Sequence, residues 1–260
     1  MDKQINWLLK EKYKGKPTKQ FYKDIERLKK GEPLDYVIGF TEFLGCKIDL
    51  SKRPLIPRPE TEFWAEKVIE KIRPSADFTL SHNFYTGYKI KILDMFAGSG
   101  CIGIAILKHI PNSLCDFADI EKNNLKQIKI NCDLNRINKK RYKTIKSDIF
   151  SGISEKYDYI FANPPYIATI LQNRIQKSVL KYEPKKALFG GKDGLFYTKK
   201  FLSKAKNHLN KDGKIYMEFD YIQKKEIEKI IKKTGYKNYK FYKDQYNKWR
   251  WVSIKLIKSK

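Results

Sequence analysis

The pattern of apolar and polar positions divides this chain at about residue 55. Before that point, residues 3–12 and 18–30 carry apolar side chains at helical spacing, so both are predicted as short charged helices. Gly31-Glu32-Pro33 ends the second helix. Residues 36–50 alternate and contain two glycines, which is typical of a β-hairpin. The two apolar stripes consist of Ile5, Leu8, Leu9, Phe21, Ile25 and Leu28.

From residue 55 onward, short apolar runs alternate with segments of helical period. Predicted strands cover residues 89–95, 114–120, 142–147, 157–162 and 214–219, followed by a hairpin near Tyr239 and across 251–257. Predicted helices cover residues 60–72, with Thr61 as a cap, then 100–109, 122–134, 195–209 and 223–233. Residues 73–88 contain Pro74 and are predicted as a loop. The alternation implies an α/β fold with a mostly parallel sheet covered on both faces.

Three regions follow from this pattern: a helical region at 1–35, a β-hairpin linker at 36–54 and an α/β domain at 55–260. With 260 residues, 41% of them hydrophobic, the chain can bury one full core beside a small appendage. No run approaches the roughly 18 apolar residues that span a membrane, and no apolar signal core is present. We therefore expect a cytoplasmic protein without membrane contact, and we take it to be a monomer. The four cysteines form no CxxC pair and the three histidines are scattered, so no metal site is predicted.

The net charge of +26 points to an anionic partner, but the kinds of basic residue present leave the cause of this charge open. Only eight of the 55 basic residues are arginine, the side chain that favours base reading and bidentate phosphate contacts. Lysine is accompanied by abundant Ile, Asn and Tyr, as an AT-rich coding sequence would produce. Coding bias and weak contact with ribosomal RNA through a basic surface both remain open.

A glycine turn follows the first predicted strand of the α/β region. Gly98-Ser99-Gly100-Cys101-Ile102-Gly103 has the spacing GxGxxG, which allows a tight turn and close approach of the backbone to a ligand. Asp119 ends the next strand, 21 residues after Gly98, where a carboxylate can accept hydrogen bonds from both ribose hydroxyls. These features fit a nicotinamide cofactor as well as S-adenosylmethionine.

Two features favour the methyl donor: Asp94, and the Asn-Pro-Pro-Tyr motif at residues 163–166, which suggests a methyl acceptor site where nothing suggests a hydride acceptor. Asp94 precedes the glycine turn, where it can meet the ammonium group or a water of a methionine moiety but would repel a pyrophosphate. Asp148 follows the third strand and is placed to accept from an adenine amino group, with Ile149 packing on the adenine face. Without a ligand, Asp148 would be a loop or cap residue.

The fourth strand leads into Asn163-Pro164-Pro165-Tyr166, which is suited to hold a planar NH2 group. An amide nitrogen is a poor nucleophile, so its lone pair must be aimed in line at the methyl group. The side-chain oxygen of Asn163 and the backbone carbonyl of Pro164 can hold its two N–H bonds, and Tyr166 can stack on the planar group. Adjacent prolines restrict the backbone. The motif fits glutamine amide, adenine amino and guanine amino acceptors equally.

The segments around these motifs closely resemble the release-factor glutamine methyltransferases. The matching blocks, in chain order, are GEPLDYVIG from residue 31, FLG from 43, LIPRPETE from 55, YEPKKALFGG from 182 and DG from 193. The resemblance implies a Rossmann-like class I fold that depends on S-adenosylmethionine, with a seven-stranded, mostly parallel sheet ending in an antiparallel hairpin. It also implies methylation of the glutamine amide in the Gly-Gly-Gln motif of peptide-chain release factors.

The resemblance assigns roles by position. The cofactor loop would comprise Phe96, Ala97, Gly98, Ser99 and Gly100, with Asp119 on the ribose, Ile149 beside the adenine and Asn163 at the border of the cofactor. The target glutamine would be bound by Asn163, Pro164, Pro165 and Tyr166, of which Asn163, Pro164 and Tyr166 are taken as catalytic. The stretch from Arg58 to Glu62 would cap the pocket, although these two side chains could equally form an ion pair at a helix start.

Two departures and two alternatives accompany this interpretation. Members of the family usually carry a longer N-terminal helical domain, so residues 1–35 are interpreted as a shortened version. Asp220 stands where the family has glycine, which puts the local turn in doubt.

An adenine or guanine amino methyltransferase acting on DNA or RNA is the main alternative, and it would need a surface for base flipping. A non-catalytic binding protein that kept the fold is the other.

Overall fold

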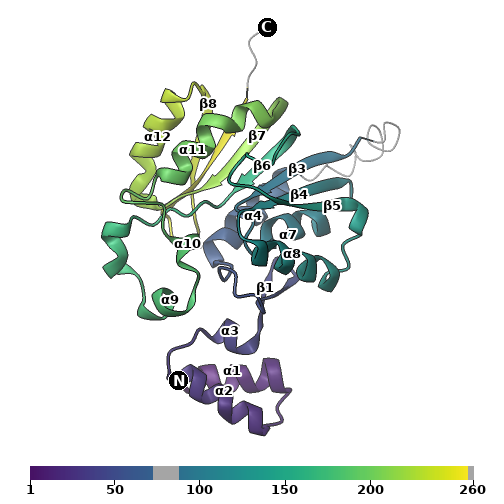
Figure 1. Ribbon diagram of the computed structural model, residues 1–260, viewed down its shortest axis with the longest axis vertical. Helices are drawn as coiled ribbons and strands as arrows, with labels where there is room; N and C mark the ends of the chain where they lie inside the picture. Colours follow the sequence, from purple (N-terminus) through teal and green to yellow (C-terminus); the bar gives the residue numbers. More distant parts are fainter. Residues whose placement is uncertain (73–87, 257–260) are drawn as a thin grey trace.

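A seven-stranded sheet lies at the centre of the larger part of the molecule (Figure 1). The computed structural model describes residues 1–72 and 88–256. In spatial order, the strands are β5 (Tyr142–Lys146), β4 (Ser113–Asp119), β3 (Ile90–Met95), β6 (Tyr157–Ala162), β7 (Leu209–Glu218), β9 (Trp249–Lys255) and β8 (Asn238–Lys243). Pairing is parallel from β5 to β7 and antiparallel from β7 through β9 to β8. The mostly parallel α/β sheet and its antiparallel end are thus confirmed.

Two apolar clusters cover the opposite faces of this sheet. Successive side chains of a strand point to opposite faces, and accordingly Ile92 of β3 belongs to one cluster and Leu93 to the other. The first cluster includes buried residues of α4 (Pro59–Ile72), α7 (Cys101–His109) and α8 (Lys122–Leu134). The second includes those of α11 (Phe196–Ala205) and α12 (Lys224–Lys233). Shorter helices are α9 (Lys177–Tyr182), α10 (Lys185–Leu188) and the 3₁₀ turns Lys139–Arg141, Thr169–Arg174, Lys206–His208 and Tyr221–Gln223.

Gly103 allows helix α7 to lie close against strand β4. A Cβ added there would come within 2.8 Å of the Cys115 sulfur and into the Phe117 ring. We expect Gly103→Ala to lower the free energy of unfolding by about 1–3 kcal/mol, because an extra methyl in a packed core displaces its neighbours. Chemical denaturation measures this. A Lys129→Ala variant on exposed helix surface is the control, and equal stability of the two variants would contradict the close packing.

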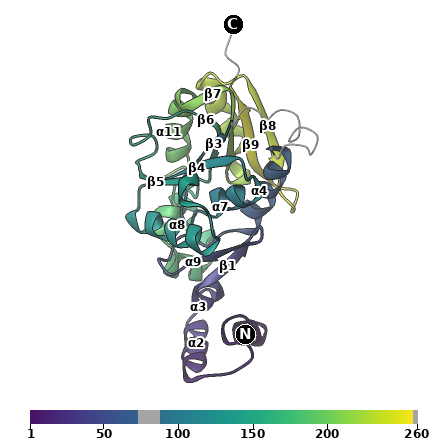
Figure 2. The same cartoon turned by 90° about the vertical axis from the view of Figure 1, so that its right-hand side faces the viewer.

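The first 38 residues form a helical lobe with a small core of its own (Figure 2). It consists of α1 (Asp2–Tyr13), α2 (Lys19–Lys29) and α3 (Leu34–Ile38), and the hydroxyl of Thr18 caps α2 by accepting from the Phe21 amide. The hairpin predicted at 36–50 is wrong at its start, because α3 continues to Ile38 and ends at Gly39 in the left-handed region. The core of the lobe comprises Leu8, Phe21, Leu28, Val37 and Ile38.

The hairpin itself is short and packs on the α/β body. It consists of β1 (Phe40–Phe43) and β2 (Cys46–Asp49). Its buried side chains share one cluster with α4 and α7. The side chains of Asn131 on α8 and of Asn135, which follows that helix, accept from the backbone amides of Asp49 and Lys47, respectively.

Several predicted boundaries differ from the observed ones. The helix predicted at 195–209 ends at Ala205, because β7 starts at Leu209 and runs for ten residues. Thr61 is not a cap, since α4 begins at Pro59 and the Thr61 hydroxyl donates to Glu218. Asp220 replaces the expected glycine without disturbance, because its carboxylate caps the following 3₁₀ turn in a capping box with Gln223.

The predicted loop at 73–88 lies almost wholly outside the described residues, as does residue 257 of the last predicted strand. In the part of the chain that the structure describes, no helix has both the length and the apolar character that crossing a membrane requires.

Candidate active site

A cavity of about 640 Å³ opens at the carboxyl ends of the parallel strands. The strand order reverses between β3 and β6, and open α/β sheets bind ligands at this switch point. Its wall includes residues that follow four strands: Phe96 after β3, Asp119 at the end of β4, Asp148 after β5 and Asn163 after β6. A volume of this size suits a small organic ligand, for which pockets measure roughly 300–1,000 Å³.

The glycine turn bends sharply along one side of this cavity. Phe96 has φ 61°, and Gly98 and Gly100 have φ 55° and 79°, so the chain passes repeatedly through the left-handed region. Ile149, which also lines the cavity, has φ 54°. Positive φ is strained for a bulky or β-branched residue, and such strain concentrates at ligand sites. Phe96 and Ile149 therefore indicate that the cavity wall keeps a backbone conformation that costs conformational energy.

Asp119 is tied to the glycine turn by backbone hydrogen bonds. Its Oδ2 accepts from the Gly98 amide at 2.8 Å, and its Oδ1 accepts from the Glu121 amide at 2.8 Å. Burial raises the pKa of this carboxyl above its ordinary value. The carboxylate lies on the cavity wall together with Asp148 and Ile149, in the arrangement that the spacing predicted. Their roles toward a cofactor remain predictions.

Two predicted cofactor residues lie behind this wall. The Asp94 carboxylate is fully buried and accepts from the Gly103 amide at 2.9 Å, at the start of α7. Burial raises its pKa to about 8. Gly100 packs toward Ile128 of α8, which a Cβ would approach to 3.0 Å. Whether Asp94 also acts on a ligand stays a prediction, but its observed contact supports the turn from beneath.

The Asn-Pro-Pro-Tyr turn contributes two of its four residues to the cavity lining. Asn163 and Pro165 line the cavity, and the Asn163 Nδ2 donates to the Thr61 hydroxyl at 3.3 Å. Pro164 is buried and is not among the lining residues. The Tyr166 hydroxyl donates to Glu218 at 3.0 Å, which anchors the end of the turn to β7. Tyr166 is not among the residues that line the cavity, and its stacking role stays a prediction.

Arg58 and Glu62 separate instead of pairing with each other. Arg58 lines the cavity and forms an ion pair with the buried Glu183 at 2.7 Å, and Glu183 also accepts from the Ile56 amide. Glu62 accepts from the Leu44 amide in the β1–β2 turn at 2.7 Å. The alternative of a helix-start ion pair between Arg58 and Glu62 is therefore wrong, while capping by Arg58 stays a prediction.

Sequence comparisons show which family of proteins this chain resembles. The family model described as "Methyltransferase small domain" matches residues 75–192. The protein named release factor glutamine methyltransferase from Lactococcus lactis is 33% identical over 254 residues, which is 96% of this chain and 88% of that protein. The chain belongs to the release factor glutamine methyltransferases. A relative of the same name from Clostridium botulinum is 35% identical over 89% of this chain and 78% of that protein.

A solved structure shares the fold of this chain. The hMettl16 catalytic domain, solved in complex with the MAT2A 3′UTR hairpin 6, superposes with a TM-score of 0.61. The match covers 83% of this chain and 77% of that chain at 15% sequence identity, so it shows a shared fold only.

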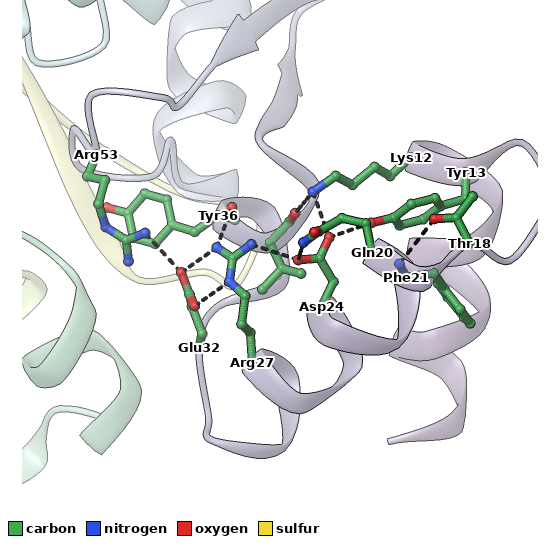
Figure 3. Close-up of polar contacts among 11 residues, drawn as sticks. Lys12, Tyr13, Thr18, Gln20, Phe21, Asp24, Arg27, Glu32, Tyr36 and Arg53 are labelled. Atoms are coloured by element: carbon green, nitrogen blue, oxygen red, sulfur yellow. Dashed lines mark hydrogen bonds and ion pairs between the residues drawn. The ribbon is translucent and has the colours of Figure 1, made fainter.

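In this methyltransferase, a chain of charged groups joins the helical lobe to the cavity rim (Figure 3). The buried Asp24 carboxylate accepts from Lys12, Tyr13, Gln20 and Arg27. Arg27 in turn holds both oxygens of Glu32, which also pairs with Arg53 at 2.9 Å. Arg53 stacks on the Tyr36 ring and lines the cavity. The orientation of the lobe is thus coupled to the edge of the site.

Asp24 is expected to control the stability of this lobe. Burial alone would raise its pKa, but hydrogen bonds from Lys12, Tyr13 and Arg27 outweigh burial and hold the pKa at about 2, below the ordinary 3.8. The stabilisation is therefore complete above about pH 4 and disappears as the pH falls toward 2. We expect Asp24→Asn to lower local stability by about 2 kcal/mol, because two cations lose a buried partner.

Hydrogen exchange measures this loss as faster exchange of the α1 and α2 amides, with the sheet unchanged. The control is Glu26→Gln in the same helix, which removes only the exposed pair with Lys29. Equal exchange in the two variants would show that the Asp24 network adds no stability.

Proposed function

We propose that this protein transfers the methyl group of S-adenosylmethionine to the side-chain amide nitrogen of the glutamine in the Gly-Gly-Gln motif of peptide-chain release factors. The observation that carries the proposal is the Asn163 turn on the wall of the cavity that Asp119 and the glycine turn enclose. Membership of the family supports the same substrate, since its members are named for it.

The residues present fit the cofactor. The Asp119 carboxylate would accept from the ribose hydroxyls, and Asp148 and Ile149 would meet the adenine, since all three line the cavity. The turn from Phe96 to Gly100 would enclose the methionine part. The cofactor supplies a methyl group on a positively charged sulfur, which makes the carbon electrophilic.

The acceptor turn would make the amide nitrogen reactive by positioning it. The Asn163 Oδ1 and the Pro164 carbonyl would each accept one N–H of the glutamine amide, which fixes the plane of the group and aims its lone pair at the methyl carbon. The nitrogen becomes positive as the new bond forms, so the two acceptor oxygens stabilise the transition state more than the ground state. The bond between the methyl carbon and sulfur would break as the N–C bond forms, with its electron pair left on sulfur, and the acidic N–H proton would then pass to solvent without a strong base.

An adenine or guanine amino group is the second candidate acceptor. It is favoured by the net charge of +26, whereas the relatives and the matched blocks favour the glutamine. We further propose that the protein acts as a monomer in the cytoplasm, where release factors are found, and that its basic surface makes weak contact with ribosomal RNA. Sedimentation and a salt-dependent RNA-binding titration test these two points.

A methyl-transfer assay with tritiated S-adenosylmethionine decides between the acceptors. The samples are a release factor, its Gln→Ala variant in the Gly-Gly-Gln motif, and total RNA and DNA from the same source. Label on the release factor that is absent from the variant supports the proposal. Label on nucleic acid alone overturns it. Cofactor binding without any turnover would identify a binding protein that kept the fold.

A further inference from the structure

Glu218 is a buried carboxylate beside the acceptor turn. It ends β7 and is 1% exposed, and it accepts three hydrogen bonds. Thr61 and Trp64 of α4 both donate to its Oε2, at 2.7 and 2.6 Å. Tyr166 of the acceptor turn donates to its Oε1 at 3.0 Å. One carboxylate therefore joins α4, the central sheet and the Asn-Pro-Pro-Tyr turn at a single point.

The hydrogen-bond polarity at this point determines which way the Asn163 amide faces. The indole N–H of Trp64 can only donate, so the Glu218 oxygen that receives it must be an acceptor. The Thr61 hydroxyl has one proton and gives it to the same oxygen. Thr61 can then only accept from Asn163, which turns the Asn163 Nδ2 toward Thr61 at 3.3 Å.

We propose that Thr61, held by Glu218, is a positioning residue that turns the Asn163 side-chain oxygen toward the acceptor group in the cavity. This inference rests on the proposed function, in which Asn163 must accept an N–H bond. A reversed Asn163 would present its own NH2 group to the substrate NH2 and would place its oxygen against a hydroxyl whose proton is already committed. The chain of hydrogen bonds from Asn163 through Thr61 to Glu218, called the relay below, excludes that orientation. The same holds for any acceptor with a planar NH2 group.

The test compares two substitutions at Thr61 that differ in one hydroxyl. Thr61→Val keeps the branched shape and removes the relay, so kcat is expected to fall about 10-fold or more. The KM for the release factor and the Kd for S-adenosylmethionine should change by less than about threefold, because neither depends mainly on the orientation of one amide. Thr61→Ser keeps the hydroxyl and should restore kcat to within about threefold of the wild type.

Glu218→Gln separates positioning from acid–base or charge effects. Because Trp64 can only donate, the glutamine oxygen should take the place of Oε2, and the relay through Thr61 should persist. We expect kcat within about fivefold of the wild type. A loss as large as that of Thr61→Val would contradict the relay and indicate that the charge itself is needed.

A thermal unfolding curve is measured for each variant to show that it is folded. If Glu218→Gln does not fold, the two Thr61 variants still test the inference, because both keep the Glu218 carboxylate. Full kcat in Thr61→Val, or equal loss in Thr61→Ser, would overturn the inference. The wild-type enzyme tests the proposed function in the same assay. If it labels nucleic acid and not the release factor, the proposed substrate is wrong, and the Thr61 comparison is then made on the labelled amino group.

Discussion

Replacing Asn163 with alanine is expected to lower the rate of methyl transfer by about 100-fold or more. The side-chain oxygen is one of two acceptors proposed for the target amide, and its contribution is greatest when the nitrogen becomes positive. Removing it costs transition-state stabilisation that the remaining Pro164 carbonyl cannot replace. Affinity for S-adenosylmethionine should stay nearly unchanged, since the cofactor contacts proposed for Asp119 and the glycine turn are retained.

Single-turnover kinetics with a release factor measure the chemical step, and calorimetry measures cofactor binding. Asn238→Ala is the matched control, because Asn238 is exposed at the start of β8 and does not line the cavity. Near wild-type turnover in Asn163→Ala would move the acceptor site to another part of the wall.

The sheet was predictable mainly because β3, β4, β6 and β7 each contain a short apolar run and alternate with helices. Ile160, Phe161 and Ala162 of β6 are buried, so the run carries a clear signal of a strand covered on both faces. The helix α3 was not predictable in the same way. It is five residues long, and a segment of that length cannot distinguish alternation from helical period.

The site was partly predictable for a related reason. Residues that follow parallel strands converge at one edge of the sheet, so Asp119, Asp148 and Asn163 could be grouped from sequence. The side-chain direction could not be inferred, and Asp94, although it lies next to the turn, bonds to Gly103 behind the wall.

The contacts of Thr61 and Glu183 bring together residues far apart in the chain. Glu218 accepts from Thr61 across 157 positions, and Glu183 pairs with Arg58 across 125. A carboxylate at the end of an apolar strand, as in Ile215-Tyr216-Met217-Glu218, is the signal that could have pointed to a buried acceptor. Its partners depend on how α4 packs across the sheet, and local sequence carries no information on that.

Asp119→Ala should weaken S-adenosylmethionine binding by about 10- to 100-fold, as expected when a hydrogen bond to a charged group is lost. The carboxylate acts twice. It would accept from the ribose, and it already fixes Gly98 and so the shape of the turn. Calorimetric titration measures the affinity, with Asp133→Ala on exposed α8 as the matched control.

The two roles of Asp119 can be compared with Asp119→Asn, whose side-chain oxygen can still accept from the Gly98 amide while its NH2 group takes the place of Oδ1 and faces the Glu121 amide. If the ribose contact dominates, the asparagine variant should bind nearly as weakly as the alanine variant although it keeps the Gly98 contact. If the turn dominates, asparagine should recover most of the affinity. Unchanged affinity in both variants would place the ribose elsewhere, and the strained Phe96 and Ile149 would then be the remaining evidence that this cavity binds a nucleoside.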